Sequence, residues 1–576
     1  MGQRQKIYGP WLEEEILEFW RKNNVCSGMF SRKKHGKPFY FLDGPPYTSG
    51  YIHLGTAWNK VLKDIIIKYL TFKGYSVRAQ PGWDMHGLPI EVLTEKRLGF
   101  KTKKDIERFG VDRFIEECKK LALKNLEIME KQFRRLGVFM DWSNPYRTID
   151  PHYIESEWYT FKKAWEKGLI YRDLRVVHWC YRCETALAEH EIEYKELEDP
   201  SIYVKFRIVG EENTYILIWT TTPWTLPANL AVLAHPDFEY VKVEVTANGK
   251  REYYWVLKDR LEAVMEEVGI REYKVIESRT GRDLEGIKYE HPLLDEVPRQ
   301  REFDEKYRNA HRIVLGPFVR TTEGTGFVHI APGHGQEDWQ IGKQYGLPIY
   351  CPVGEDGAFV EGEWKGMFVK DADKHIIERL RDKGALLYSG RIRHRYPTCW
   401  RCKSPLLFRA TKQWFLAVSK IKDLIIECDK RDVEWVPAWV RKRYHDGVAN
   451  VGDWVISRQR FWNTPIPIWV CQECGHIVVV GSIEELRQRA KNDVPESLDP
   501  HRPTVDRIVL RCEKCGGDMR RVEDVLDVWF DSAICCWASL GYPRRMDEFE
   551  RYFPADMIIE GQDQVLKWFY LSLIHI

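Results

Sequence analysis

The spacing of apolar side chains predicts helices in the amino-terminal part of the chain. Leu12, Ile16, Phe19 and Trp20 recur at helical intervals, and the charged segment 103–136 has a helical pattern that is interrupted at Gly110. A further helix is expected over residues 57–70. The side chains predicted to face inward from that helix are Val61, Leu62, Ile65, Ile66 and Tyr69.

Short apolar runs predict strands in two regions. Residues 39–42 form a buried-strand run, which a glycine-containing loop separates from the helix over 57–70. That order is typical of the nucleotide-binding start of an α/β domain. Between about 200 and 390, glycine-bounded strands dominate, and the clearest cover 203–209, 215–220, 240–245 and 253–257. This β-rich block is interpreted as a domain inserted into the α/β domain.

Length and charge limit the class of protein. A chain of 576 residues is too long for one core and is expected to hold about three to five domains. The formal net charge is only +2, so any nucleic-acid binding would use local basic patches. No apolar run approaches the roughly 18–20 residues of a membrane span, and residues 1–6 precede no apolar core of a leader peptide. A cytoplasmic protein without a membrane partner is therefore expected.

Residues 44–56 read GPPYTSGYIHLGT and follow the first predicted strand. The ring of His53 can meet phosphate oxygens, and Gly55 lets a base or ribose approach the backbone. The positive end of the following helix points at the same place. The string resembles the HIGH signature of the class I aminoacyl-tRNA synthetases, in which this loop binds ATP. Thr56 stands where that signature has its last His, and its hydroxyl still donates and accepts hydrogen bonds.

Four further motifs extend the resemblance to the isoleucine, valine and leucine branch of that family. They are 82–91 (GWDMHGLPIE), 453–462 (DWVISRQRFW), 527–532 (DVWFDS) and 560–569 (EGQDQVLKWF), the last of which departs from the family pattern at Leu566 and Lys567. The resemblance implies an α/β fold with a Rossmann-type parallel-sheet catalytic domain. It also implies activation of L-isoleucine to an adenylate and transfer to tRNA(Ile), with ATP and Mg²⁺ as further ligands.

The resemblance also implies roles for single residues of these motifs. Asp84 and Gln564 would hold the substrate ammonium through charge-assisted hydrogen bonds. His53 and Glu560 would lie against the adenylate. The walls of an apolar side-chain pocket would be Pro45, Trp462 and Trp568. Core packing is the simpler explanation for any one of the 23 tryptophans, but the motif positions of these two favour the pocket.

Two motifs inside the β-rich block, 218–229 (IWTTTPWTLPAN) and 324–338 (GTGFVHIAPGHGQED), resemble the editing motifs of isoleucyl enzymes. Thr222 stands where valyl and leucyl enzymes usually have Arg. An apolar pocket discriminates one methylene by only about 1–3 kcal/mol, a magnitude established on this same family of enzymes, so a second site is expected. The residues that would position a water and the ester are Thr221, Thr222, Thr225 and Asn229. Asp338 would bind the ammonium of mischarged valine, and His329 would exclude isoleucine by bulk.

Four CxxC pairs predict two structural zinc sites of the closed Cys₄ kind, which leave no open position for water. The first set brackets the β-rich block and comprises Cys180, Cys183, Cys399 and Cys402. In the second set each pair is followed by glycine, as in zinc ribbons; it comprises Cys471, Cys474, Cys512 and Cys515. Redox-active pairs are the alternative. The other cysteines are interpreted as core or surface thiols.

The expected organisation divides the chain into five segments. They are 1–195 (amino-terminal helix, first half of the catalytic domain and first zinc half-site), 196–392 (inserted editing domain), 393–465 (return to the catalytic domain with the rest of the first zinc site), 466–525 (zinc-ribbon insertion) and 526–576 (second half of the catalytic domain, truncated). In the family a KMSKS motif and a helical anticodon-binding domain follow. A fragment of a monomeric enzyme, impaired in aminoacylation, is therefore expected.

Three other interpretations stay open. The chain is a valyl or leucyl enzyme, or it is a truncated, non-catalytic tRNA-binding or editing-only protein. The third, a zinc-ribbon nucleic-acid binder, explains the cysteines but not the nucleotide and editing motifs.

Overall fold

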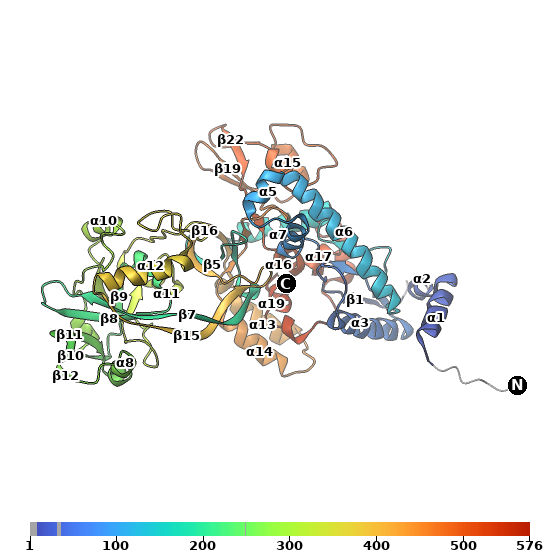
Figure 1. Cartoon of the computed structure of the whole chain (residues 1–576). Coiled ribbons are helices and arrows are strands. Elements are labelled where there is room, and N and C mark those ends of the chain that lie inside the picture. The colour runs from blue at the N-terminus through green and yellow to red at the C-terminus, as the bar shows by residue number, and fades with distance from the viewer. Residues whose placement is uncertain (1–7, 32–35, 248, 576) are drawn as a thin grey trace. The chain divides into compact units, whose positions relative to one another are not determined.

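The computed structural model describes residues 8–31, 36–247 and 249–575. Residues 1–6, on which the expected absence of a leader peptide depended, lie outside the described residues. The chain forms two compact units, one comprising Met1–Arg172 and Trp414–Ile576 and the other Asp173–Gln413 (Figure 1). In the parts of the chain that the structure describes, no helix has both the length and the apolarity that a membrane crossing needs.

A parallel sheet forms the centre of the first unit. Strand β1 (Pro38–Leu42) pairs in parallel with β2 (Ser76–Arg78) on one side and with β24 (Met557–Ile558) on the other. Helix α3 (Leu54–Phe72) connects β1 to β2. Since β1 and β24 come from opposite ends of the chain, the sheet brings the loop after residue 43 next to the loop after residue 558. The expected α/β class with a parallel sheet is confirmed.

Helix α3 forms where a helix was predicted, but the prediction of its inward face is wrong at three of five positions. The other two, Val61 and Ile66, are half-buried, and Ile66 packs against the core. Leu62, Ile65 and Tyr69 are 42%, 54% and 56% exposed, whereas Lys60 and Lys63 are almost fully buried. The reason is the carboxylate of Asp43, which follows β1, contacts both lysines and is itself fully buried. A buried carboxylate requires paired cations, so the charged side of α3 faces inward.

Most other elements of the first unit surround this sheet or extend from it. Gly110 separates α5 from α6 with a φ of 104°, as the interruption in the pattern predicted. The amino-terminal elements are α1 (Pro10–Lys22), α2 (Val25–Ser31), β3 (Gly82–Trp83), α4 (Leu88–Leu98), α5 (Lys103–Phe109), α6 (Val111–Arg135), β4 (Tyr146–Arg147) and α7 (Pro151–Glu166). Those after the second unit are α13 (Lys422–Asp432), α14 (Val440–Asn450), β17 (Trp454–Val455), β18 (Ser457–Arg458), β23 (Val525–Leu526), α16 (Val528–Ala533), α17 (Cys535–Ala538), α18 (Met546–Tyr552) and α19 (Trp568–His575).

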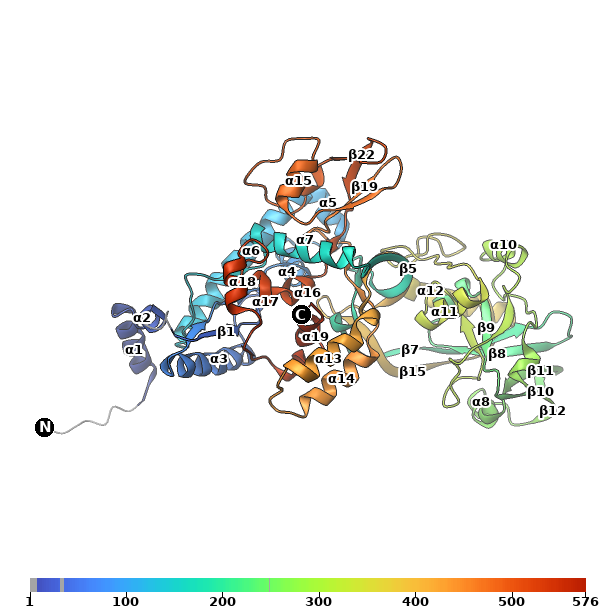
Figure 2. The ribbon, with the colours of Figure 1, turned by 180° about the vertical axis from the view of Figure 1, so that it is seen from behind.

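A small module is formed by the part of the chain between β18 and β23 in the first unit. It contains a four-stranded sheet in the order β20-β19-β22-β21 and the short helix α15, seen from two sides in Figures 1 and 2. The bounds are β19 (Ile468–Cys471), β20 (Ile477–Val479), α15 (Ile483–Arg489), β21 (Leu510–Arg511) and β22 (Asp518–Arg521). Its core includes Trp469, Val505 and Met519 and continues onto Ile154 and Trp158 of α7, which fixes the module to the unit.

The second unit is rich in β-structure, as expected. Its larger sheet has the order β12-β10-β11-β8-β7-β15, and its smaller sheet has the order β13-β9-β14. The long strands β7 (Ile192–Arg207) and β15 (Leu386–Cys399) are antiparallel partners along most of their length (Figure 1). The expected limits of the inserted domain, 196 and 392, fall inside these two strands. All four predicted strands occur, in β7, β8, β10 and β11, although β7 ends at Arg207, two residues before the predicted end of the first.

The remaining bounds of the second unit follow the chain in order. They are β5 (Ile170–Cys180), β6 (Thr185–Leu187), β8 (Thr214–Thr220), β9 (Ala231–Ala234), β10 (Glu239–Ala247), β11 (Lys250–Leu257), α8 (Leu261–Glu267), β12 (Tyr273–Thr280), α9 (Gly281–Leu284), α10 (Arg299–Lys306), β13 (Arg312–Leu315), β14 (Val328–Ile330), α11 (Gln336–Tyr345), α12 (Val369–Asp382) and β16 (Leu407–Leu416). The first residues of β5 and the last of β16 belong to the first unit.

Candidate functional site

The loop after β1 is held by a buried group of charges. Lys60 and Lys63 of α3 both contact the carboxylate of Asp43, and the Nζ of Lys63 also lies 2.5 Å from Oε1 of Glu560. Burial acts to raise the pKa of Asp43, but the two ammonium groups outweigh it and hold that pKa below its usual range. The group joins the residue after β1, the helix α3 and the second residue after β24.

Glycine at position 44 is required by this arrangement. A Cβ atom there would lie 2.4 Å from Oε1 of Glu560, so any side chain would displace the carboxylate. The structure therefore brings the predicted nucleotide loop and Glu560 together.

His53 caps the amino terminus of α3. Its Nδ1 accepts the backbone N–H of Thr56 at 3.2 Å, and its Nε2 lies 3.1 Å from Oγ1 of the same threonine. Both ring nitrogens of this exposed histidine are thus engaged by the residue that replaces the last His of the expected signature. Gly55 lies directly beneath the ring, since a Cβ there would be 3.1 Å from it. His53, Gly55 and Thr56 form one small cluster at the positive end of a 19-residue helix.

Three of the predicted amino-acid pocket residues lie at or beside the segment 84–87. The backbone N–H of Asp84 donates to the carbonyl of Pro46 at 3.1 Å, which places this buried carboxylate beside the loop that contains Pro45. The indole N–H of Trp462 donates to the Met85 carbonyl at 2.8 Å. These contacts join Pro45, Asp84 and Trp462 in one region.

Trp568 and Gln564 have partners outside the segment 84–87. The indole N–H of Trp568 donates to the backbone carbonyl of Ser532 at 3.0 Å, so Trp568 is tied to the 527–532 motif. The side-chain amide of Gln564 donates to Asp563 at 2.8 Å, and this contact does not reach Asp84.

In the second unit, the two predicted editing motifs meet at His329. The Nε2 of its ring lies 2.9 Å from Oγ1 of Thr225, and its Nδ1 lies 3.4 Å from Nδ2 of Asn229. The hydroxyl of Thr225 donates to the Thr222 carbonyl. Oγ1 of Thr222 lies 3.4 Å from Oγ1 of Thr225 and 3.3 Å from Oγ1 of Thr220. Burial lowers the pKa of His329 to about 4, so the ring is neutral at pH 7.

Asp338 is held close to this network by a short turn. Its Oδ2 accepts the backbone N–H of Ala331 at 2.8 Å, and Gly335 leaves it room, because a Cβ there would lie 2.6 Å from the carboxylate carbon. Burial raises the pKa of Asp338 to about 7. Thr221 is half-buried in the same segment as Thr222. Apart from Thr221, each predicted editing residue has a defined partner.

Two residues that sequence reasoning did not single out complete the site. The hydroxyl of Tyr289 donates to Oδ1 of Asn229 at 2.5 Å, which fixes the amide so that its N–H₂ faces His329. Asp373 on α12 accepts the backbone N–H of Trp224 at 2.9 Å and stabilises the threonine-rich turn. Neither residue belongs to a motif with a recognisable spacing, so long-range contacts are the one signal that identifies them.

Both cysteine sets form compact tetrads of free thiols. In each tetrad the four sulfur atoms lie within 4.8 Å of one another. The sulfur atoms of the pairs Cys180–Cys402 and Cys471–Cys515 are 3.4 Å apart, near the spacing of about 3.8 Å that a tetrahedral Zn–S distance of about 2.3 Å implies. Both tetrads therefore fit a zinc ion.

The residue after every CxxC pair adopts the left-handed conformation. Gly475 and Gly516 have φ values of 70° and 78°, and Glu184 and Lys403 have φ values of 50° and 64°. The first tetrad thus has the same backbone turn as the second, although its sequence lacks the glycine that usually marks it. The turn points both sulfur atoms of a pair towards one centre.

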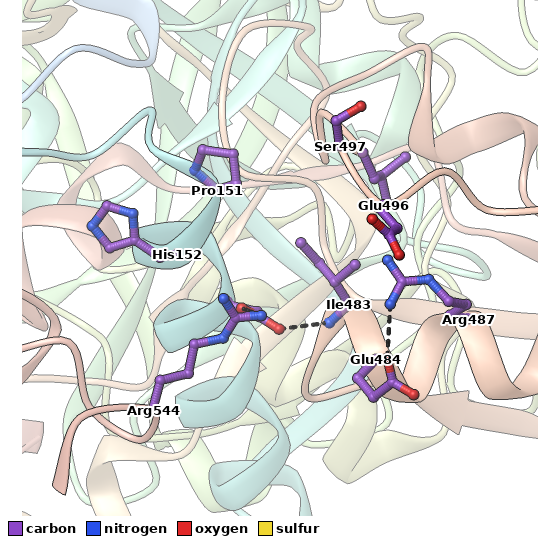
Figure 3. Close-up of a pocket in the computed structure, with 10 residues that line it drawn as sticks. Pro151, His152, Ile483, Glu484, Arg487, Glu496, Ser497 and Arg544 are labelled. Atoms are coloured by element: carbon purple, nitrogen blue, oxygen red, sulfur yellow. Dashed lines mark hydrogen bonds and ion pairs between the residues drawn. The ribbon is translucent and has the colours of Figure 1, made fainter.

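A surface pocket of about 490 Å³ lies between the start of α7 and the inserted module (Figure 3). Its lining is of mixed charge: Arg544 pairs with Glu155 at 2.7 Å, and Arg487 pairs with Glu484 at 2.7 Å. No residue predicted from the sequence as part of a site lines it.

Comparison with known proteins agrees with these motifs. Residues 15–575 match the family model described as tRNA synthetases class I (I, L, M and V). The chain is 57% identical over 584 residues to the isoleucine–tRNA ligase of Pyrococcus horikoshii, covering 97% of this chain and 54% of that protein. The isoleucine–tRNA ligases of Methanocaldococcus jannaschii and Methanopyrus kandleri are 56% and 51% identical over 568 and 600 residues, covering 97% and 99% of this chain and 54% and 55% of theirs.

The chain spans about half the length of these curated relatives. The family model nevertheless extends over almost the whole chain, from the helix α1 to α19. The chain therefore belongs to the class I tRNA synthetases of the isoleucine, leucine, methionine and valine group.

Proposed function

We propose that this chain carries the amino-acid activation site and the editing site of an isoleucine–tRNA ligase. The observation that carries the proposal is the pair of chemically distinct clusters, each within its own compact unit: the His53–Glu560 region and the His329–Thr225 region. Relatives named isoleucine–tRNA ligase at 50–57% identity support isoleucine over valine as the substrate, as does Thr222 in the editing motif.

In the activation step, the isoleucine carboxylate attacks the α-phosphate of ATP and pyrophosphate leaves. Asp84 binds the substrate ammonium, and Pro45 and Trp462, with Trp568 and Gln564, form the rest of the amino-acid site. His53 and the amino terminus of α3 face the phosphates, where the helix dipole stabilises negative charge. Mg²⁺ bound with the ATP would neutralise further charge. Catalysis consists of positioning and charge stabilisation, and no covalent nucleophile is needed.

In the transfer step, a ribose hydroxyl of the terminal tRNA adenosine takes the acyl group from the adenylate. A mischarged valyl ester then enters the second unit. Thr221, Thr222 and Thr225 position the ester and a water, Asp338 binds the free ammonium, and His329 limits the length of side chain that fits. The two zinc tetrads act structurally, by holding the base of the second unit and the module inserted in the first.

Binding of an adenylate analogue tests the proposal directly. We expect the 576-residue chain to bind a non-hydrolysable isoleucyl-adenylate analogue more tightly than the valyl analogue, measured by isothermal titration calorimetry. The difference should be about 1–3 kcal/mol, the known contribution of one methylene in this family. Asp84→Asn should weaken binding of both analogues. A preference for the valyl analogue would identify a valyl enzyme, and hydrolysis of Val-tRNA without any analogue binding would identify an editing-only protein.

A further inference from the structure

A continuous chain of buried polar contacts runs from the 527–532 motif to the inserted module. Oδ2 of Asp531 lies 2.6 Å from Nδ1 of His86, and Nε2 of His86 lies 2.7 Å from Nε2 of His501. Nδ1 of His501 lies 2.5 Å from Oδ1 of Asp499, whose other oxygen accepts from Lys119 at 3.0 Å. Asp531, His86 and His501 are at most 2% exposed, whereas the Asp499 side chain is 42% exposed. None of these five residues has a role in the reaction described above.

The contacts fix the place of each proton. The pKa of Asp499 lies below the usual range, because its bonds to His501 and Lys119 outweigh burial. Asp499 is therefore a carboxylate and accepts the hydrogen bond from Nδ1–H of His501. Burial lowers the pKa of His501 to about 4 and that of His86 to about 3, so both rings are neutral. Nε2 of His501 must then accept from Nε2–H of His86.

The remaining lone pair of His86, on Nδ1, requires a donor. Asp531 is that donor, since burial raises its pKa well above the usual range and keeps the carboxylic acid protonated. These side chains thus form a hydrogen-bond relay in which every donor points the same way. Its members are the acid of Asp531, the rings of His86 and His501 in fixed tautomers, and the carboxylate of Asp499 near the surface. Its buried end is uncharged.

The buried end of the relay lies near the proposed amino-acid site, because Asp531 contacts His86, two residues after Asp84, and the indole N–H of Trp568 donates to the carbonyl of Ser532, the residue after Asp531. The carboxyl of Glu157 is fully buried as well, and burial raises its pKa well above the usual range. With Asp531 and Glu157 uncharged, no negative charge on these two competes with Asp84 for the substrate ammonium.

His501 also supports the pocket wall directly. Its ring is stacked on the indole of Trp462, with centroids 4.6 Å apart and an interplanar angle of 17°. The His86 ring meets the same indole edge-on at 5.0 Å. Arg502, the next residue of the module, donates to the carbonyl of Arg460 at 3.3 Å. The module therefore contacts the segment 460–462 at two points, the Trp462 ring and the Arg460 carbonyl.

We propose that His501, supplied by the inserted module, is a positioning residue of the amino-acid site: it orients Trp462 by stacking and holds His86 in the tautomer whose Nδ1 accepts from Asp531. The proposal rests on the function proposed above. It gives the module a role in substrate selection in addition to its predicted zinc ion: loss of His501 should weaken isoleucine recognition without removing the fold.

Three variants of the full chain separate the two contributions of His501. His501→Phe keeps a flat ring on Trp462 and removes both nitrogens, His501→Gln keeps an acceptor for His86 and removes the stacked ring, and His501→Ala removes both. We expect the dissociation constant of the isoleucyl-adenylate analogue to rise about tenfold in His501→Phe and in His501→Gln, since each loses one buried contact. It should rise further in His501→Ala, which loses both. His152→Ala, which changes an exposed histidine of the same unit, is the matched control and should bind as the unsubstituted chain does.

NMR of the ring nitrogens reports which nitrogen of each histidine carries the proton, and a purely structural role of His501 would not change this for His86. In the unsubstituted chain we expect His501 to carry its proton on Nδ1 and His86 on Nε2. The ring-nitrogen signals of His86 should keep the pattern of a proton on Nε2 in His501→Gln and lose it in His501→Phe. Circular dichroism and zinc content should be unchanged in both variants.

The outcomes distinguish this inference from the proposed function. If the unsubstituted chain binds no adenylate analogue, the proposed function fails, and the NMR signatures alone then decide whether the relay exists. If the unsubstituted chain binds and the His501 variants bind within twofold of it, the positioning role is overturned. A proton on Nδ1 of His86 in the unsubstituted chain overturns the relay, even where a variant does not fold.

Discussion

Nε2 of His329 lies 2.9 Å from Oγ1 of Thr225, and this contact joins the two halves of the proposed editing site. The Thr225 hydroxyl already donates to the Thr222 carbonyl, so it accepts the Nε2–H of His329. Nδ1 of the ring then accepts from Asn229, whose amide Tyr289 orients. His329 is therefore held neutral and in one orientation, as a rigid wall requires.

The first prediction concerns the hydroxyl of Thr225. Thr225→Val preserves shape but removes the acceptor for His329, leaving a buried N–H without a partner, which costs about 1–3 kcal/mol. Hydrolysis of Val-tRNA(Ile) should fall about 10–100-fold. Thr225→Ser, which keeps the hydroxyl, is the control and should retain most of the activity. Equal rates for the Val and Ser variants would show that the contact does not matter.

The second prediction is a pH dependence of editing. Burial raises the pKa of Asp338 to about 7, and only the ionised carboxylate binds an ammonium group. Since the protonated form dominates below pH 7, kcat/KM for Val-tRNA hydrolysis should rise with pH, reach half its limit near pH 7, and fall about tenfold per unit in more acidic solution. A profile that is flat between pH 5.5 and 8 would remove Asp338 from ammonium binding.

The third prediction concerns metal content. Native mass spectrometry should find two zinc ions per chain, one for each tetrad. Cys402→Ser and Cys515→Ser should each lower the content by one ion, whereas Cys428→Ser, which changes a cysteine outside both tetrads, should leave two. Removal of zinc by a chelator should lower the thermal stability of the chain. Retention of both ions in either tetrad variant would contradict the assignment.

The fourth prediction tests which face of α3 is buried. Lys63→Met leaves the carboxylates of Asp43 and Glu560 partly uncompensated and should lower the free energy of unfolding by about 3–5 kcal/mol. Leu62→Gln, one position away on the exposed side, should change it by less than about 0.5 kcal/mol. Urea denaturation measures both. The reverse order would mean that the apolar face of α3 is the buried one.

Helix α3 shows that apolar spacing predicts a helix better than it predicts which face of the helix is buried. The spacing predicts the helix itself, because period and length are local properties. It fails on the inward face, because the partners of Lys60 and Lys63 are Asp43 and Glu560, and the second of these lies at the other end of the chain.

The candidate sites divide in the same way. The CxxC spacing suffices to predict the cysteine tetrads. The grouping of His329 with Thr225 was predicted from the resemblance of two strings to family motifs. Tyr289, Asp373 and His501 carry no such string. Their roles depend on tertiary contacts to Asn229, Trp224 and Trp462, which local sequence does not encode.

The central claim is that this chain selects isoleucine at one site and hydrolyses the mischarged valyl ester at a separate site. The most direct test compares the unsubstituted chain with Asp338→Ala in two assays, hydrolysis of Val-tRNA(Ile) and binding of the isoleucyl-adenylate analogue. Loss of a buried charge-assisted contact should slow hydrolysis by about 10²-fold or more and leave analogue binding unchanged. Hydrolysis at the unsubstituted rate, or a parallel loss of analogue binding, would contradict the account.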